Sequence, residues 1–214
     1  MLNLSLREIA IIIPVILVSL TVHELAHAAA ALALGDDTAK LDGRVTLNPL
    51  RHVDPFGFLM IVVAGFGWAK PVRFDRTKLR RPERDEVLIA FAGPFSNLLL
   101  AVIGVLAIRI VVWNRGLAAS TSATLVLDVL FAFCSINVAL AVFNSLPIPP
   151  LDGSHAITTI IGRRNPAAAA AFAKYGLMLL IGAILVDRVA GINLLPIARL
   201  TRAILTAMLS AVGV

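Results

Sequence analysis

Long apolar segments dominate the sequence, and short polar stretches separate them. A transmembrane helix needs about 20 consecutive, mostly apolar residues. Four segments meet this requirement: 9–34, 87–113, 123–143 and 167–186. A fifth, 193–214, is weaker because Arg199 and Arg202 lie in its first half, so it either spans or lies on the surface as an amphipathic helix. The pattern predicts an all-α polytopic membrane protein built as a bundle of four to five transmembrane helices.

Local signals mark where these helices begin, break and end. Ser5 followed three residues later by Glu8 resembles a capping box before the first segment. The Gly93-Pro94 pair predicts an early break in the second segment, because proline lacks the backbone N–H that a helix uses. Prolines between Asn144 and Gly153 end the third segment.

The region between the first two spans has a different character. Residues 57–68 are apolar but too short to cross a membrane as a helix, and residues 43–47 have the composition of a short strand. Bare strand edges do not survive in lipid. We therefore expect a short strand-like or re-entrant segment here, packed against the rest of the protein.

Composition and charge support the membrane class. Hydrophobic residues make up 59% of the 214 residues and charged residues only 15%, whereas a soluble domain is about a quarter charged. The formal net charge is +6, and residues 70–84 hold seven basic side chains against two acidic ones. We interpret this stretch as juxtamembrane charge on the cytoplasmic side rather than a nucleic-acid site. The prediction is a multi-pass protein of the cell membrane with its N-terminus outside.

The first span contains three ionisable residues, which are costly in a membrane helix and usually mark function. His23 and His27 are four residues apart and so share one helical face, and Glu24 follows His23 directly. This is the H-E-x-x-H pattern of zinc proteases. The alternative, two unrelated histidines on a solvated helix surface, suits a soluble protein and not an apolar segment.

A catalytic zinc site usually has three protein ligands, so a third ligand must lie elsewhere. Asp152 is the best candidate, because the prolines before it unwind the chain and can aim its carboxylate into the bundle. Its alternative is a plain Leu-Asp-Gly turn. His52 is the rival ligand, and His155 could support the site from behind the ligands. His23 lies about 20 Å from the outer end of its span, which places the site nearer the cytoplasm.

Three motifs together resemble the site-2 proteases, the M50 family of intramembrane zinc metalloproteases, in their compact form without a PDZ or CBS domain. They are His23-Glu-Leu-Ala-His27, Gly93-Pro-Phe-Ser-Asn97 and the stretch from Asn144 to Leu151-Asp-Gly153. The resemblance implies one zinc per chain held by His23, His27 and Asp152, with Glu24 as catalytic acid and base. It implies roles near the substrate or the oxyanion for Asn97 and Asn144. Hydrogen bonding between helices is the alternative for both asparagines.

The expected function is therefore hydrolysis of peptide bonds in or near the transmembrane segments of single-pass membrane proteins, in regulated intramembrane proteolysis. We expect a single membrane-embedded domain over 1–214, with the catalytic core at about 5–162 and C-terminal helices at 167–214. The expected partners are the lipid bilayer and the substrate, with no nucleic acid, and the oligomeric state is open. A zinc transporter and a catalytically inactive, zinc-stabilised binding protein are the alternatives.

Overall fold

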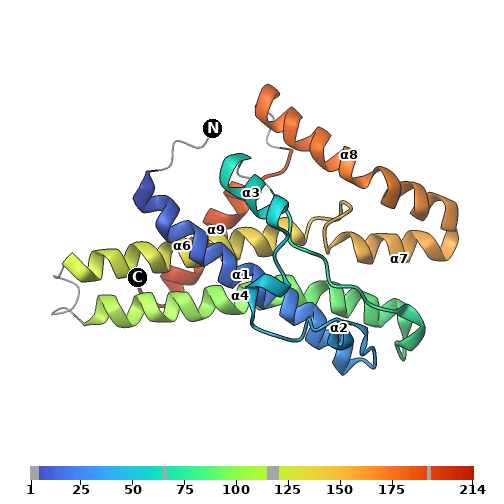
Figure 1. The fold of residues 1–214 in the computed structure, drawn as a ribbon. Helices are drawn as coiled ribbons and strands as arrows, with labels where there is room; N and C mark the ends of the chain where they lie inside the picture. The colour runs from blue at the N-terminus through green and yellow to red at the C-terminus, as the bar shows by residue number, and fades with distance from the viewer. Residues whose placement is uncertain (1–4, 65–66, 115–120, 192–193) are drawn as a thin grey trace.

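The computed structural model describes residues 5–64, 67–114, 121–191 and 194–214, which form helices joined by loops (Figure 1). The long helices are α1 (Leu6–Ala33), α4 (Pro82–Trp113), α6 (Thr121–Asn144) and α8 (Pro166–Ala190). The shorter ones are α2 (Thr38–Leu41), α3 (Pro55–Ala64), α7 (Ser154–Arg164) and α9 (Ile197–Ala211), with 3-10 turns at Pro49–Arg51 and Arg76–Lys78. The all-α class is confirmed for this part of the chain.

Four helices among the described residues are long and apolar enough to cross a membrane, and they match the four predicted spans. Helix α9 has 15 residues and rises about 22 Å, which is less than the roughly 30 Å of a hydrocarbon core. It is not among the four. The chain is thus a multi-pass membrane protein.

The observed ends of the helices follow from local chemistry. The capping box before α1 is confirmed: Ser5 Oγ accepts from the Glu8 amide at 3.2 Å, and the Glu8 carboxylate accepts from the Ser5 amide at 2.8 Å. The expected break at Gly93-Pro94 is wrong, because α4 continues through both residues. Proline removes one backbone hydrogen bond from the helix. In a membrane protein, groups on neighbouring helices can satisfy the carbonyl that loses its partner.

Three spans form the centre of the molecule. Helices α4 and α6 lie side by side along much of their length, and α1 crosses both (Figure 1). Helix α9 packs against the α4–α6 pair through Leu205, Met208 and Leu209, which contact the buried side chains of Ile108 and Cys134. The polar side chains described below lie where α1, α4 and α6 meet.

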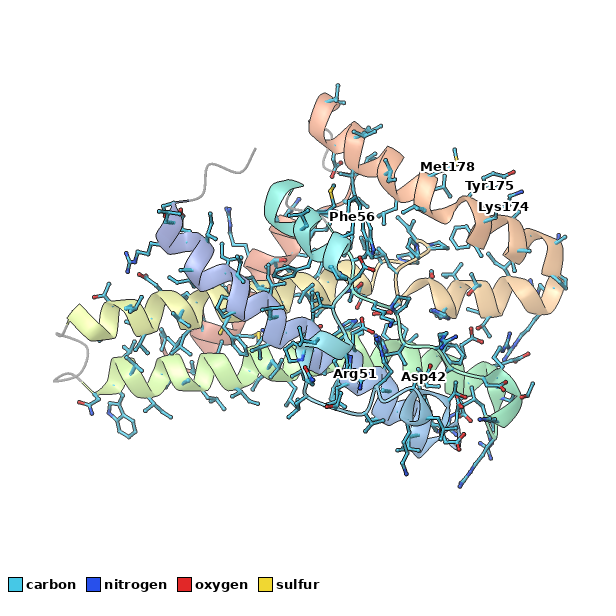
Figure 2. All side chains as sticks on the ribbon, viewed as in Figure 1. Asp42, Arg51, Phe56, Lys174, Tyr175 and Met178 are labelled. Atoms are coloured by element: carbon cyan, nitrogen blue, oxygen red, sulfur yellow. The ribbon has the colours of Figure 1, made fainter. Side chains whose placement is uncertain are left out.

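Helices α7 and α8 extend from the end of α6 as an antiparallel pair (Figure 1). Gly176 of α8 packs closely against the loop after α6: a Cβ added at Gly176 would lie 2.2 Å from Cβ of Pro149. Lys174, Tyr175 and Met178 project from the side of α8 that faces away from α7 (Figure 2). Further along α8, the apolar side chains of Met178, Leu179 and Leu185 are exposed and so are available to lipid in a membrane.

The predicted strand-like or re-entrant segment between the first two spans is not supported in the described residues. Residues 57–64 belong to α3, and residues 65–66 of the same prediction lie outside the described residues. The sequence signal for this helix is Asp54-Pro55: Asp54 Oδ1 accepts from the Gly57 amide at 2.7 Å, and proline suits the first helical position.

Residues 43–47 form bends and no strand. The strand-type pairing that the described residues do show is an isolated antiparallel bridge between Val53 and Ala69. Side chains satisfy the loop carbonyls instead: Arg44 donates to the carbonyls of Arg51 and Lys70, and His52 Nε2 donates to the Thr46 carbonyl at 2.8 Å. A strand ladder is therefore not needed to satisfy this backbone.

Candidate metal centre

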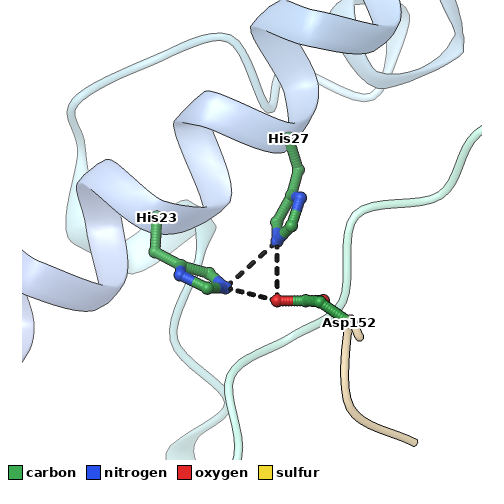
Figure 3. A group of neighbouring side chains, drawn as sticks. All are labelled: His23, His27 and Asp152. Atoms are coloured by element: carbon green, nitrogen blue, oxygen red, sulfur yellow. Dashed lines mark hydrogen bonds and ion pairs between the residues drawn. The ribbon is translucent and has the colours of Figure 1, made fainter. Parts of the chain in front are cut away.

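Three side chains from distant parts of the sequence converge at the centre of the bundle. His23 and His27 point from successive turns of α1 towards Asp152, which lies in the loop after α6 (Figure 3). Asp152 Oδ2 lies 3.1 Å from His23 Nε2 and 3.4 Å from His27 Nε2, and the two Nε2 atoms are 3.0 Å apart. Both histidines are buried.

The hydrogen-bond partners of the two Nδ1 atoms determine whether the Nε2 atoms, which face Asp152, carry a proton. His23 Nδ1 lies 2.6 Å from Asn97 Oδ1, and His27 Nδ1 lies 2.7 Å from the Ile89 carbonyl. A carbonyl can only accept, so each neutral ring carries its proton on Nδ1 and presents a lone pair at Nε2. Two lone pairs and a carboxylate oxygen thus face one another and need a cation between them. Two imidazoles and one carboxylate are a known ligand set of catalytic zinc sites, so these residues fit the metal.

Gly93 of α4 makes room for this cluster. An added Cβ there would lie 2.4 Å from His27 Nε2 and 2.6 Å from His23 Nε2, which is closer than real contacts allow. The glycine is needed for the close approach of α4 to the imidazoles.

The loop after α6 holds Asp152 in place by folding back on the helix end. The Gly153 amide donates to the Asn144 carbonyl at 2.7 Å, and a Cβ on Gly153 would lie 2.2 Å from the Ser145 carbonyl oxygen. The loop thus holds the Asp152 carboxylate against the two imidazoles.

Glu24 is buried one residue along α1 from His23, and a cation from the first loop faces it. Arg44 Nη2 lies 3.8 Å from Glu24 Oε2 while the same guanidinium donates to two loop carbonyls. The Arg44 side chain is itself buried. Arg44 thus joins the first loop to the glutamate of the H-E-x-x-H motif.

The two other candidate histidines lie outside the three-residue cluster. His52 is fully buried, and its Nε2 is used by the Thr46 carbonyl. Burial lowers the pKa of His52, helped by the nearby Arg44 guanidinium, so the ring is neutral at pH 7. His155 Nδ1 lies 3.0 Å from Glu86 Oε1, and the His155 amide donates to the Asp152 carbonyl.

The two candidate asparagines have different surroundings. Asn97 is fully buried and has protein partners at both ends of its amide: His23 Nδ1 at Oδ1, and Asn137 Oδ1 at 2.8 Å from Nδ2. Asn144 is half-buried at the end of α6, and its Nδ2 donates to the Leu140 carbonyl of the same helix at 3.0 Å.

Sequence reasoning overlooked three polar residues at this site: Ser19, Arg44 and Asn137. An amide inside the third apolar span and a hydroxyl one turn before His23 were visible signals, because polar groups in a membrane helix need partners. Arg44 gave no such signal, since its position beside Glu24 depends on how the first loop folds.

Comparison with known proteins identifies the family of this chain. The model of peptidase family M50 matches residues 11–186. "Putative zinc metalloprotease YwhC" of Bacillus subtilis is 45% identical over 147 residues, which cover 68% of this chain and 67% of that protein. "Putative zinc metalloprotease Rip2" of Mycolicibacterium smegmatis is 30% identical over 170 residues, which cover 77% of this chain and 62% of that protein.

A third relative, "Putative zinc metalloprotease Rip3" of Mycobacterium tuberculosis, is 32% identical over 151 residues, which cover 70% of this chain and 30% of that protein. The matched region is thus about two thirds of the first two relatives and less of the third. No solved structure gives a significant match. The family match extends over most of the chain and includes both the motif helix and the Asp152 loop. The chain therefore belongs to peptidase family M50 and is a zinc metalloprotease.

Proposed function

We propose that this zinc metalloprotease hydrolyses peptide bonds in or near the transmembrane segments of single-pass membrane proteins, in regulated intramembrane proteolysis. The observation that carries the proposal is the position of the cluster. Two imidazole lone pairs and a carboxylate converge between helices that are apolar enough to cross a membrane. A hydrolytic centre in that position meets substrates that are themselves in the membrane.

In this proposal His23, His27 and Asp152 hold zinc, and Glu24 is the acid–base group. When bound, zinc would polarise a water molecule and the carbonyl of the peptide bond to be cut. The Glu24 carboxylate takes a proton from the attacking water and returns it to the leaving amine as the C–N bond breaks. Glu24 is buried, which keeps bulk water away from it. The Arg44 guanidinium lies 3.8 Å from its negatively charged carboxylate.

We assign contact with the substrate to Asn144. Its side chain is half-buried at the end of α6, next to the loop that carries Asp152, whereas the Asn97 amide is enclosed by protein groups. An amide N–H at this position could donate to the substrate backbone or to a developing oxyanion.

For orientation, we propose that the N-terminus is outside and that the site lies nearer the cytoplasm. The support is the excess of basic residues between α3 and α4, together with Arg163 and Arg164 at the end of α7. We further propose that the chain acts as a single domain embedded in the bilayer.

The test uses purified protein in detergent and a synthetic single-pass substrate, with zinc measured by mass spectrometry and cut sites mapped on the products. Wild type should hold about one zinc and cut within the apolar segment of the substrate. Glu24→Gln should keep zinc but lose at least ~100-fold in kcat, because proton transfer is lost. Asp152→Ala should lose zinc and activity together.

His52→Gln and Asp128→Asn are matched controls, since they change a buried histidine and an acidic residue of α6 outside the cluster. Both should keep zinc. Cleavage by Glu24→Gln, or cuts confined to the soluble parts of the substrate, would contradict the proposal. Zinc binding by wild type with no cleavage would favour a transport or binding protein.

A further inference from the structure

Four polar groups form a continuous hydrogen-bonded chain inside the bundle, ending at His23. The His23 ring is hydrogen-bonded to Asn97 of α4, which is hydrogen-bonded to Asn137 of α6. Asn137 Nδ2 in turn donates to Ser19 Oγ of α1 at 2.9 Å. Ser19, Asn97 and Asn137 are fully buried. The chain therefore links all three central helices behind the metal cluster, away from Asp152.

Backbone carbonyls fix the direction of every bond in this chain. The Phe133 carbonyl lies 2.9 Å from Asn137 Nδ2, and the Ser19 carbonyl lies 3.4 Å from Asn97 Nδ2. Carbonyls only accept, so each amide must turn its NH₂ group towards them. Asn137 then offers its oxygen to Asn97, and Asn97 offers its oxygen to His23.

The consequence at His23 is a fixed tautomer. A ring that faces an amide oxygen must carry its proton on Nδ1, which leaves Nε2 free as a ligand. We infer that Asn97 and Asn137 are positioning residues for the metal centre: through a chain anchored on Ser19, they orient the His23 ring and fix the proton on Nδ1. This inference rests on the ligand set of the proposed function and gives Asn97 a role other than contact with substrate.

The test measures zinc affinity by competition with a chelator, without any substrate. Asn97→Leu should weaken zinc binding by about 10–100-fold, the usual effect of removing a partner of a ligand histidine. Asn137→Leu and Ser19→Ala should weaken it in the same direction by less. Asn97→Asp keeps an acceptor for His23 Nδ1 but loses the NH₂ group that bonds to Asn137, so it should weaken zinc binding less than Asn97→Leu does.

A double variant separates positioning from general damage. If Asn137 acts through Asn97, Asn137→Leu should cause no further loss of zinc affinity once Asn97 is leucine. Cys134→Ala is the matched control, because Cys134 lies one turn before Asn137 in α6 and packs into the same α4–α6 contact without joining the chain. It should lower thermal stability and leave zinc affinity unchanged.

Equal zinc affinity in wild type and Asn97→Leu would overturn the inference, as would full additivity in the double variant. If Asn97→Leu does not fold, Asn137→Leu and Ser19→Ala decide: unchanged affinity in both would overturn the inference. Absence of zinc binding by wild type would instead contradict the proposed function and its ligand set. The two failures are thus distinguishable.

Discussion

Gly93 shows how closely single residues are fitted at this site. It lies in an ordinary helix, where glycine costs about 1 kcal/mol relative to alanine, and it gains nothing there from backbone freedom. Glycine is needed there for space, because the Nε2 atoms of the two imidazoles lie only 2.4 and 2.6 Å from the position that a Cβ would take.

Gly93→Ala should therefore separate helix propensity from function. We expect loss of zinc and of proteolysis, since α4 and α1 must move apart or the imidazoles must turn, and zinc content measured after purification checks this.

Gly182→Ala is the control, because it adds a Cβ to α8 with nothing within 4 Å. It should keep full zinc content and gain up to about 1 kcal/mol in unfolding free energy. Retention of zinc by Gly93→Ala would show that the helices can separate without harm.

At the scale of elements, a buried carboxylate fastens the end of α1 to the segment before α4. Asp36 is fully buried, and it accepts from the Thr38 amide at 2.9 Å and from the Asp75 amide at 2.6 Å. Burial alone would raise the pKa of Asp36, but these hydrogen bonds and the nearby Lys78 outweigh it, so the pKa lies below its usual value.

The stability that Asp36 contributes should depend on pH. A lowered folded-state pKa means that the contribution is present above about pH 4, the unfolded value, and is lost as pH falls through the folded value. Asp36→Asn should cost about 1–3 kcal/mol at pH 7, because the buried Asp75 amide then faces an NH₂ group or loses its charged acceptor. Thermal unfolding should show this difference shrinking towards pH 3.

Asp42→Asn is the comparison, because it removes an exposed pair with Arg73 and should cost less than about 1 kcal/mol. A difference between Asp36→Asn and wild type that stays constant with pH would contradict the role given to the Asp36 charge.

The four spans and the cap of α1 were predictable, because long apolar runs and a Ser-x-x-Glu pattern determine them locally. The pairing of His23 with His27 was also predictable from helical periodicity. The connection before α4 was not: its backbone is satisfied by Arg44 and His52, which become partners only after the loop has folded. The Asn137 amide was visible in the sequence, but its partners were not.

At the scale of the whole molecule, the proposed zinc ligands come from two separate parts of the chain. His23 and His27 belong to α1, whereas Asp152 lies in the loop that leads to α7 and α8. A metal bound there would cross-link the central helices to the α7–α8 pair.

Removing zinc should therefore lower the stability of the protein as a whole. Binding to the folded state alone stabilises by about 4 kcal/mol when free zinc is 1,000 times its Kd. We expect a lower Tm after treatment with a chelator, and recovery when zinc is returned.

Asp152→Ala should show the low Tm with or without zinc, whereas Glu24→Gln should behave like wild type. A Tm of the wild-type protein that is unaffected by chelation would show that the α7–α8 pair is held without the metal.

The loop that presents Asp152 also has a consequence for synthesis. A nascent chain that has made α1 already carries both imidazoles and Glu24, but the carboxylate follows only after α4 and α6. In the proposed site, the ribosome must therefore release three spans before the set of ligands is complete. If the proposed ligand set is correct, the order of the elements delays proteolysis until α1, α4 and α6 have all been made, so a chain that ends before Asp152 has no activity.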